Sequence, residues 1–302
     1  MTKPAFTQSQ KRFQESLSPL FSPASSRTCL FIKSSSDQGV IRNGGRNGAR
    51  YAPQSLMATF KRFTQDNQIK DFSFAEAEVA DPQDEINDFH GSQERQSERI
   101  KSLLDQHQSA SIIHIGGGHD HVYPLLKAAS QGYSKVVVLN IDAHADTRTD
   151  EEHHSGTPFR QFAEAFSGEF SLYQIGLHHF ANSFSTLSPL KSGKQIVLWR
   201  NEINSASLDQ FFKQMEVDID KETRVFFSLD ADALNGYEIP GVSAVNPNGL
   251  SLLELRDLWA RFKKLPISHP SIMGIYELNP VYDSLASVSM RTIGSFIFES
   301  IG

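Results

Sequence analysis

Residues 136–146 read Val-Val-Val-Leu-Asn-Ile-Asp-Ala-His-Ala-Asp, and this stretch decides the fold class. Its apolar first part predicts a strand buried on both faces, as in a parallel sheet covered by helices. Asp142, His144 and Asp146 then follow at every second residue, and on an extended chain such side chains point the same way. We therefore expect the three to converge at the carboxyl end of the strand, where open parallel sheets bind ligands. The alternative is a strand-to-loop junction with capping aspartates and a surface histidine.

Further apolar runs alternate with amphipathic segments along the chain. Strands are predicted at residues 29–32, 78–80, 111–115, 172–177, 195–199, 224–230 and 272–277. Helices are predicted at residues 53–63, 82–106, 123–130, 208–217, 250–262 and 285–301. This alternation implies right-handed crossovers and a parallel sheet. Residues 1–28 are polar and are predicted to form an N-terminal arm, and residues 29–302 are predicted to form one domain.

The overall composition restricts the class of partner. With 39% hydrophobic and 21% charged residues, the chain has the make-up of an ordinary globular protein. Its formal net charge of -6 offers no basic field, so no nucleic-acid partner is expected. No apolar run has the length of a membrane span, and the first residues lack the apolar core of a signal peptide. Cys29 is the only cysteine, so the sequence predicts a cytoplasmic protein without disulfides or a thiolate zinc site.

Three of the predicted strands end in side chains that bind metals. They are His119 after the first, Asp142, His144 and Asp146 after the second, and Asp230 and Asp232 after the third. Four carboxylates and two imidazoles suit hard or borderline divalent ions such as Mn²⁺. Without cations between them, the clustered carboxylates would repel one another strongly. Two ions about 3.5–4 Å apart with a bridging water would relieve this repulsion, and such a water becomes a hydroxide nucleophile near neutral pH.

Three segments of the chain resemble the signatures of the arginase, agmatinase and formimidoylglutamase (ureohydrolase) family. They are Gly116-Gly117-Gly118-His119-Asp120, Asp142-Ala143-His144-Ala145-Asp146 and Ser228-Leu229-Asp230-Ala231-Asp232. The resemblance implies a three-layer α/β/α sandwich with a mostly parallel central sheet and two Mn²⁺ ions per chain. It implies one ion held by His119, Asp142, Asp146 and Asp230, and a second held by His144, Asp142, Asp230 and Asp232.

The same resemblance implies two catalytic carboxylates. Asp146 would hydrogen-bond the bridging hydroxide and then relay a proton to the departing amine. Glu277, in Tyr276-Glu277-Leu278-Asn279-Pro280, matches the acidic residue that faces the amidine or guanidinium group in this family. A surface acid at the end of a strand is the alternative interpretation of Glu277.

Other segments are most similar to the formimidoylglutamase branch of the family. They are residues 37–46, 146–148, 155–160 and 240–244. Arginases and agmatinases carry a proton-shuttle histidine where Ser155 stands, and His154 is the adjacent candidate to replace it.

The branch determines which substrate contacts we expect. Arg148 and Arg160 would grip substrate carboxylates, since a guanidinium can bind a carboxylate bidentately. Ser155, Gly156 and Thr157 would form the loop that faces the same cleft. The alternative for Arg148 is a surface ion pair with the acidic residues 150–152. Among the other histidines, His114 is interpreted as a core residue, and His178 and His179 are candidates for lining the pocket.

The resemblance implies an amidine hydrolase that converts N-formimino-L-glutamate and water to L-glutamate and formamide, a reaction of histidine degradation. Two alternatives stay open. One is a guanidino hydrolase, acting on agmatine or a guanidino acid and releasing urea. The other is a metal-free regulatory pseudoenzyme. The fold also allows a homo-oligomer.

Overall fold

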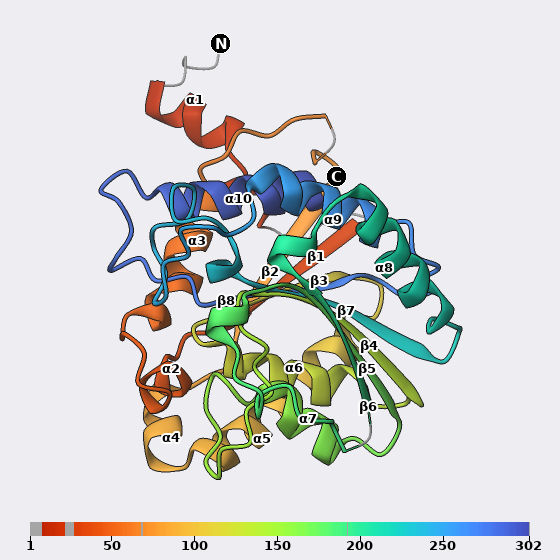
Figure 1. Ribbon diagram of the computed structural model, residues 1–302. Coiled ribbons are helices and arrows are strands. Elements are labelled where there is room, and N and C mark those ends of the chain that lie inside the picture. Colours follow the sequence, from red (N-terminus) through yellow and green to blue (C-terminus); the bar gives the residue numbers. More distant parts are fainter. Residues whose placement is uncertain (1–7, 22–26, 68, 192, 302) are drawn as a thin grey trace, which may run out of the picture.

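Parallel strands form the centre of the protein, as the computed structural model shows for residues 8–21, 27–67, 69–191 and 193–301 (Figure 1). The eight strands are β1 (Arg27–Ser34), β2 (Phe72–Glu78), β3 (Ser111–Gly116), β4 (Lys135–Ile141), β5 (Glu169–Leu177), β6 (Gly193–Trp199), β7 (Thr223–Asp230) and β8 (Ile272–Tyr276). They lie in the order β2-β1-β3-β8-β7-β4-β5-β6, and each neighbouring pair is parallel. The predicted parallel sheet is confirmed.

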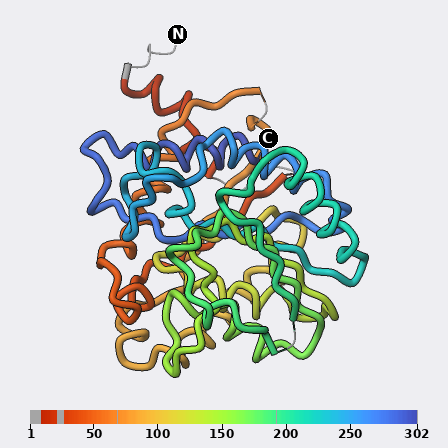
Figure 2. The backbone as a smooth tube through the Cα atoms, in the orientation of Figure 1, coloured from red at the N-terminus to blue at the C-terminus, as the bar shows by residue number. Residues whose placement is uncertain are grey.

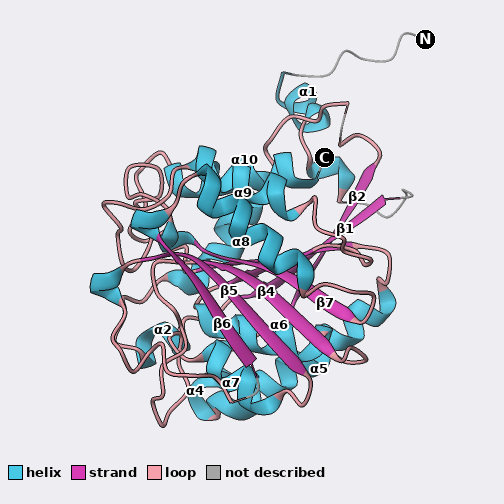
Figure 3. Ribbon diagram, turned by 45° about the vertical axis from the view of Figure 1, so that its right-hand side comes forward, coloured by secondary structure: helices cyan, strands magenta, loops and turns pink. Residues whose placement is uncertain are grey.

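Helices cover both faces of this sheet (Figures 1 and 3). On one face lie α3 (Ala52–Phe60), α8 (Ser205–Val217), α9 (Leu252–Phe262) and α10 (Val288–Ile301). On the other lie α5 (Phe89–Gln106), α6 (Val122–Ala129) and α7 (Pro158–Ala165), with the short α4 (Pro82–Asn87) beside α5. The predicted three-layer α/β/α arrangement is therefore confirmed.

The central strand β4 shows why the apolar run in the sequence is unbroken. Val136 and Val138 pack into the core with α6 and α7, whereas Val137 and Leu139 pack into the core on the opposite face. Successive side chains of a strand alternate between faces, so a strand covered on both sides favours apolar residues at successive positions. Burying each such side chain contributes about 1.5–3 kcal/mol, which makes β4 a main source of stability.

The second strand lies earlier in the chain than predicted. Residues 78–80 were expected to form it, but β2 spans Phe72–Glu78 at the edge of the sheet. Phe72 and Phe74 are buried, while Glu76 points outward and pairs with Lys61 at 2.5 Å. An edge strand that is solvated on one side alternates polar and apolar residues, and this weak apolar signal explains the misplacement.

Two helices form in segments that were predicted to be loops. The glycine-rich segment after β1 contains α2 (Gln38–Arg42), and the segment after residue 157 forms α7. Pro158 stands in the first turn of α7, where its missing N–H costs no hydrogen bond, and Phe159 and Phe162 are buried in the core. Sequence reasoning read this segment only as part of a substrate loop, so the helix was missed.

The described part of the N-terminal arm is attached to the domain. It contains α1 (Gln8–Glu15), and Leu17 is buried, with its N–H donating to the carbonyl of Phe63 at 2.8 Å. β1 begins at Arg27, two residues before the predicted domain boundary. Residues 1–7 and 22–26 of the predicted arm lie outside the described residues. Over the described ranges, no helix combines the length and apolar character needed to cross a membrane.

A buried histidine in β3 should make folding sensitive to acid. His114 bonds through its two ring nitrogens to Ser34 Oγ at 2.9 Å and Tyr276 OH at 3.0 Å, and burial lowers its pKa to about 3. The unfolded chain protonates this histidine below about pH 6.5, so the unfolded state binds more protons and stability falls as the pH drops. We expect His114 to account for a loss of about 2 kcal/mol between pH 8 and pH 5.

Urea unfolding at these two pH values checks the expectation. The free energy of unfolding of His114→Asn should depend less on pH than that of the wild type, whatever its absolute stability. His90→Asn, at an exposed position, serves as the control and should keep the wild-type dependence. The same pH dependence in all three proteins would contradict the assignment.

Candidate metal centre

The carboxyl ends of four neighbouring strands meet at the centre of the sheet. In the order β3-β8-β7-β4, the residues at or just after the carboxyl ends of these strands are His119, Glu277, Asp230 and Asp142. Ile141 of β4 lies opposite Leu229 of β7, so the next residues along the two strands are Asp142 and Asp230. Residues more than 100 positions apart in the chain are thus brought together by strand order alone.

The first group of candidate ligands surrounds His119. Its Nδ1 atom lies 3.1 Å from Asp142 Oδ2, 2.9 Å from Asp146 Oδ2 and 3.2 Å from Asp230 Oδ2. The other ring nitrogen, Nε2, is 2.9 Å from Ser228 Oγ, and the ring stacks on Tyr276 with 4.8 Å between centroids. These contacts hold the imidazole so that Nδ1 faces the three carboxylates.

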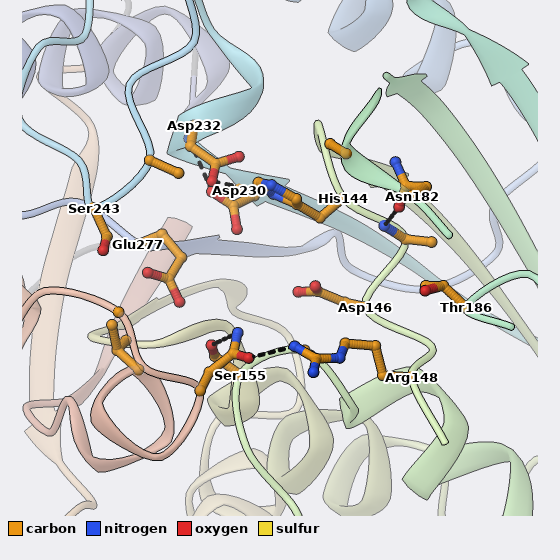
Figure 4. Close-up of a pocket in the computed structure, with 17 residues that line it drawn as sticks. His144, Asp146, Arg148, Ser155, Asn182, Thr186, Asp230, Asp232, Ser243 and Glu277 are labelled. Atoms are coloured by element: carbon orange, nitrogen blue, oxygen red, sulfur yellow. Dashed lines mark hydrogen bonds and ion pairs between the residues drawn. The ribbon is translucent and has the colours of Figure 1, made fainter. Parts of the chain in front are cut away.

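The second group consists of Asp142, His144 and Asp232. Of these, His144 and Asp232 are labelled in Figure 4. His144 Nδ1 lies 3.3 Å from Asp232 Oδ2 and 3.7 Å from Asp142 Oδ1. Asp142 belongs to both groups, which is the geometry expected of a bridging ligand. The predicted bridging role of Asp230 stays a prediction, because its oxygens group only with the first set.

The donor atoms fit a pair of divalent cations. His119 Nδ1 and Asp232 Oδ1 are buried and make no hydrogen bond, although His119 Nδ1 has three carboxylate oxygens around it. A buried polar atom without a partner destabilises the fold by its desolvation free energy, unless a bound ligand interacts with it. Burial and the neighbouring Asp142 charge raise the pKa of Asp146 to about 6. Burial and the charges of Asp232 and Asp142 also raise the pKa of Asp230 well above its usual range. Cations between these carboxylates would remove both penalties.

Two of the acidic residues have an uncommon backbone conformation. Asp146 has a φ of 50° and Glu277 has a φ of 62°, both in the left-handed region. For residues other than glycine this conformation costs on the order of 1–3 kcal/mol and persists only where the surroundings impose it. Glu277 is held on both sides: its N–H donates to Gly117 O at 2.8 Å, and its Oε1 accepts from His119 N at 3.0 Å.

Four of the six candidate ligands, His144, Asp146, Asp230 and Asp232, line an open pocket (Figure 4). The polar residues that line it are Asn43, His144, Asp146, Arg148, Ser155, Asn182, Thr186, Asp230, Asp232, Ser243 and Glu277. Gly156 also lines it, so three of the five predicted substrate contacts, Arg148, Ser155 and Gly156, do reach the pocket. The loops that follow β1 and β4 lie together here (Figure 2), joined by the bond from Arg148 to Asn43 Oδ1 at 2.6 Å.

The other two predicted substrate contacts lie outside the pocket lining. Thr157 is buried, and its Oγ1 donates to the carbonyl of His154 at 2.9 Å. Arg160 donates to three main-chain carbonyls, those of Thr147 at 2.8 Å, Ser188 at 3.0 Å and Pro189 at 3.2 Å. Both side chains hold loops through these bonds, and their contact with substrate stays a prediction.

The candidate histidines outside the metal cluster are also engaged elsewhere. His154 accepts the Gly156 N–H at Nδ1 (3.0 Å) and contacts Asp150 Oδ2 through Nε2 (2.7 Å), so neither nitrogen is left to carry a proton to substrate. His178 Nε2 lies 3.1 Å from Asn246 Nδ2, and His179 stacks on Trp199. None of these three histidines is among the residues that line the pocket.

Sequence reasoning missed a residue that supports the ligand loop. Asn182 accepts from Ala145 N at 2.7 Å and donates to Ala143 O at 2.9 Å, which fixes the backbone on both sides of His144. It lies in the loop after β5, where no motif marks it. Thr186 was missed for the same reason. Asn43 and Ser243 lie in segments 37–46 and 240–244, which resemble the formimidoylglutamase branch, but nothing in those segments singled them out as pocket residues.

Removing a ligand shared by the two groups should cost more metal than removing an unshared one. We expect Asp142→Ala to lose both ions and Asp232→Ala to lose mainly one, because only Asp142 belongs to both groups. The measurement is elemental analysis of protein loaded with Mn²⁺ and freed of excess ion. Asp257→Ala, at a surface carboxylate paired with Arg261, is the control and should bind as the wild type does. Full metal content in both ligand variants would rule out the assignment.

Comparison with known proteins agrees with this geometry. The chain is 27% identical over 294 residues to the formimidoylglutamase of Geobacillus kaustophilus (strain HTA426), covering 94% of this chain and 87% of that protein. It is 30% identical over 257 residues to the formimidoylglutamase of Staphylococcus aureus (strain bovine RF122 / ET3-1), covering 82% and 78%.

Solved structures show the same fold. The crystal structure of Trypanosoma cruzi formiminoglutamase with Mn²⁺ has a TM-score of 0.77 at 25% identity, covering 95% of this chain and 97% of that chain. Formimidoylglutamase from Bacillus subtilis has a TM-score of 0.80 at 21% identity, covering 93% and 88%. The model of the arginase family matches residues 35–302, which contain every candidate ligand, and the chain therefore belongs to the arginase family.

Proposed function

We propose that this protein is a manganese-dependent hydrolase of linear amidines that converts N-formimino-L-glutamate and water to L-glutamate and formamide. The observation that carries the proposal is one pocket in which a cluster suited to two metal ions faces the guanidinium of Arg148. The substrate has a cationic formimino group and two carboxylates, and the pocket offers acids at one end and a cation at the other. The formimidoylglutamases among its relatives support the same reaction.

The metal ligands would be His119, Asp142, His144, Asp146, Asp230 and Asp232. When bound, the ions supply Lewis acidity and a water of lowered pKa, which is the nucleophile for attack at the formimino carbon. The unsatisfied Nδ1 atom of His119 supports a metal-bound enzyme over a metal-free regulatory protein.

Glu277 is placed to bind the cationic end of the substrate. Its side chain lines the pocket, and burial raises its pKa to about 8. A buried carboxylate of this kind gains a full negative charge when a cation comes close, because the cation favours its ionised form. Glu277 would therefore hold and orient the formimino group.

Asp146 would be the residue that moves the proton. It lies in the pocket and contacts His119 at 2.9 Å, so it reaches the reaction centre from the loop after β4. A carboxylate here accepts a proton from the attacking water and returns it to the departing amine. Its left-handed backbone aims the side chain at this position.

Arg148 would bind a substrate carboxylate at the pocket wall. Its guanidinium has five N–H donors. Two of the five are used in the described contacts, with Asn43 Oδ1 at 2.6 Å and Asp150 Oδ2 at 2.8 Å, so three remain for a ligand. Agmatine carries no carboxylate and ends in a cation, which Arg148 would repel. This contrast favours formiminoglutamate over an agmatine-like guanidino substrate.

We also infer a cytoplasmic location and no nucleic-acid partner. The single cysteine, Cys29, is buried and free, and the net charge of -6 is unsuited to a polyanion. We also propose that the chain forms a homo-oligomer, which a measurement of its molecular mass in solution would test.

Replacing Arg148 should weaken substrate binding without affecting the metal. We expect Arg148→Met to lose roughly 2–4 kcal/mol in kcat/KM on formiminoglutamate, mostly through KM. Steady-state kinetics with formamide, ammonia and urea measured separately test this, using agmatine as the competing substrate. Arg256→Met, at an exposed arginine paired with Glu299, is the matched control. Faster turnover of agmatine by the wild type, or an unchanged KM in Arg148→Met, would refute the substrate assignment.

Removing the metal should abolish activity reversibly. A chelator should stop turnover, and added Mn²⁺ should restore it, because the nucleophile is a metal-bound water. The loaded enzyme should become more active as the pH rises through about 7 to 9, where such a water loses its proton. Assays with and without chelator across this range provide the measurement. Full activity after the ions have been removed, as verified by elemental analysis, would overturn the mechanism.

A further inference from the structure

We propose that Asp150 and His154 act as positioning residues that hold Arg148 ready for the substrate carboxylate. The proposal rests on the proposed function, and it assigns to the loop after β4 a role in substrate specificity. The three side chains are bonded in series: Arg148 NH2 lies 2.8 Å from Asp150 Oδ2, and the same oxygen lies 2.7 Å from His154 Nε2. A carboxylate oxygen has two lone pairs, so it accepts from both neighbours at once.

The hydrogen bonds of His154 determine which of its nitrogens carries the proton. The Gly156 N–H donates to Nδ1 at 3.0 Å, so Nδ1 is unprotonated. The proton of the neutral ring is therefore on Nε2, which donates to Asp150. His154 is buried, and burial lowers its pKa, which favours the neutral ring. His154 is thus a fixed donor that holds the carboxylate of Asp150.

The same segment also fixes the main chain of Arg148. Its N–H donates to the carbonyl of Gly156 at 3.0 Å. Gly156 lies between the two side chains: a Cβ atom at this position would come within 3.1 Å of both Arg148 Cδ and His154 Cε1. Main chain and side chain of Arg148 are therefore both set by residues 150–156.

A second contact holds the opposite edge of the guanidinium. Arg148 NH1 donates to Asn43 Oδ1 at 2.6 Å, and Asn43 Nδ2 donates to Ser155 Oγ at 3.1 Å. The arginine side chain is 46% exposed, so without these bonds it would sample many rotamers. Fixing it in advance lowers the entropy that binding must remove, and it places the remaining donors for a carboxylate.

A neighbouring ion pair provides the contrast. Glu152, in the same loop as Asp150, pairs with Arg42 of α2 at 2.8 Å, but the side chain of Glu152 is 79% exposed. Exposed pairs of this kind contribute little, because the carboxylate is mostly solvated. Asp150 differs because it is held by a buried imidazole. Glu152→Ala is therefore a matched control for Asp150→Ala.

The test is steady-state kinetics on two substrates, with metal content measured in each variant. Formiminoglutamate carries the carboxylates, and N-propylformamidine has the same reacting group without them. Asp150→Ala and His154→Ala should raise KM for formiminoglutamate about ten-fold. Neither should change turnover of N-propylformamidine or the metal content. His154→Gln, whose amide can still donate to Asp150, should recover part of the loss.

A double variant separates positioning from general damage to the loop. If Asp150 acts through Arg148, adding Asp150→Ala to Arg148→Met should cause no further rise in KM. Additive effects in the double variant, or an equal KM for Asp150→Ala and Glu152→Ala, would overturn the proposal. If the wild type does not hydrolyse formiminoglutamate, the proposed function fails instead. The positioning is then tested by a crystal structure of Asp150→Ala, where an Arg148 still bonded to Asn43 would refute it.

Discussion

Repulsion among four buried carboxylates is the largest electrostatic cost in this structure, and the rest of the site is arranged around it. Asp142, Asp146, Asp230 and Asp232 lie together with at most a small exposed area, and burial makes each negative charge costly. If these acids were protonated instead, they would carry no negative charge to attract a cationic amidine. Divalent cations resolve the conflict, so the binding of metal and the stability of this edge of the sheet are linked. The fold supplies the geometry, and the ions supply the compensating charge.

Strand order is the means by which the chain assembles this cluster. β3, β8, β7 and β4 are neighbours, although β3 and β8 lie far apart in the sequence. Helices on both faces exclude water, which strengthens each electrostatic interaction at the strand ends. The same packing sustains the left-handed backbone of Asp146 and Glu277. The helix layers contain none of the candidate ligands, yet their packing keeps the carboxylates close together and sustains the backbone strain at Asp146 and Glu277.

The metal ligands could be predicted from the sequence because they directly follow buried strands. Parallel strands share one carboxyl edge, so three motifs after apolar runs had to meet. The pocket wall could not be predicted in this way, because it consists of loops whose paths no periodicity describes. Asn182 and Thr186 carry no motif, and α7 lies in a segment that was read as a loop. β2 was misplaced since an edge strand lacks the apolar run that marked β4.

Arg148 and Arg160 differ in how many of their hydrogen-bond donors the surrounding loops leave for a ligand. Both follow the ligand motif in the sequence, and both were expected to bind a substrate carboxylate. Arg160 donates its hydrogen bonds to main-chain carbonyls of neighbouring loops. Arg148 contacts Asn43 and Asp150 through two of its N–H groups, and its other N–H groups are left for a ligand in the pocket. If Arg148 binds substrate as proposed, the hydrogen bonds of the loops determine substrate choice, while the residues at the strand ends determine the reaction. A family can then change its substrate by altering loops and leave the metal cluster unchanged.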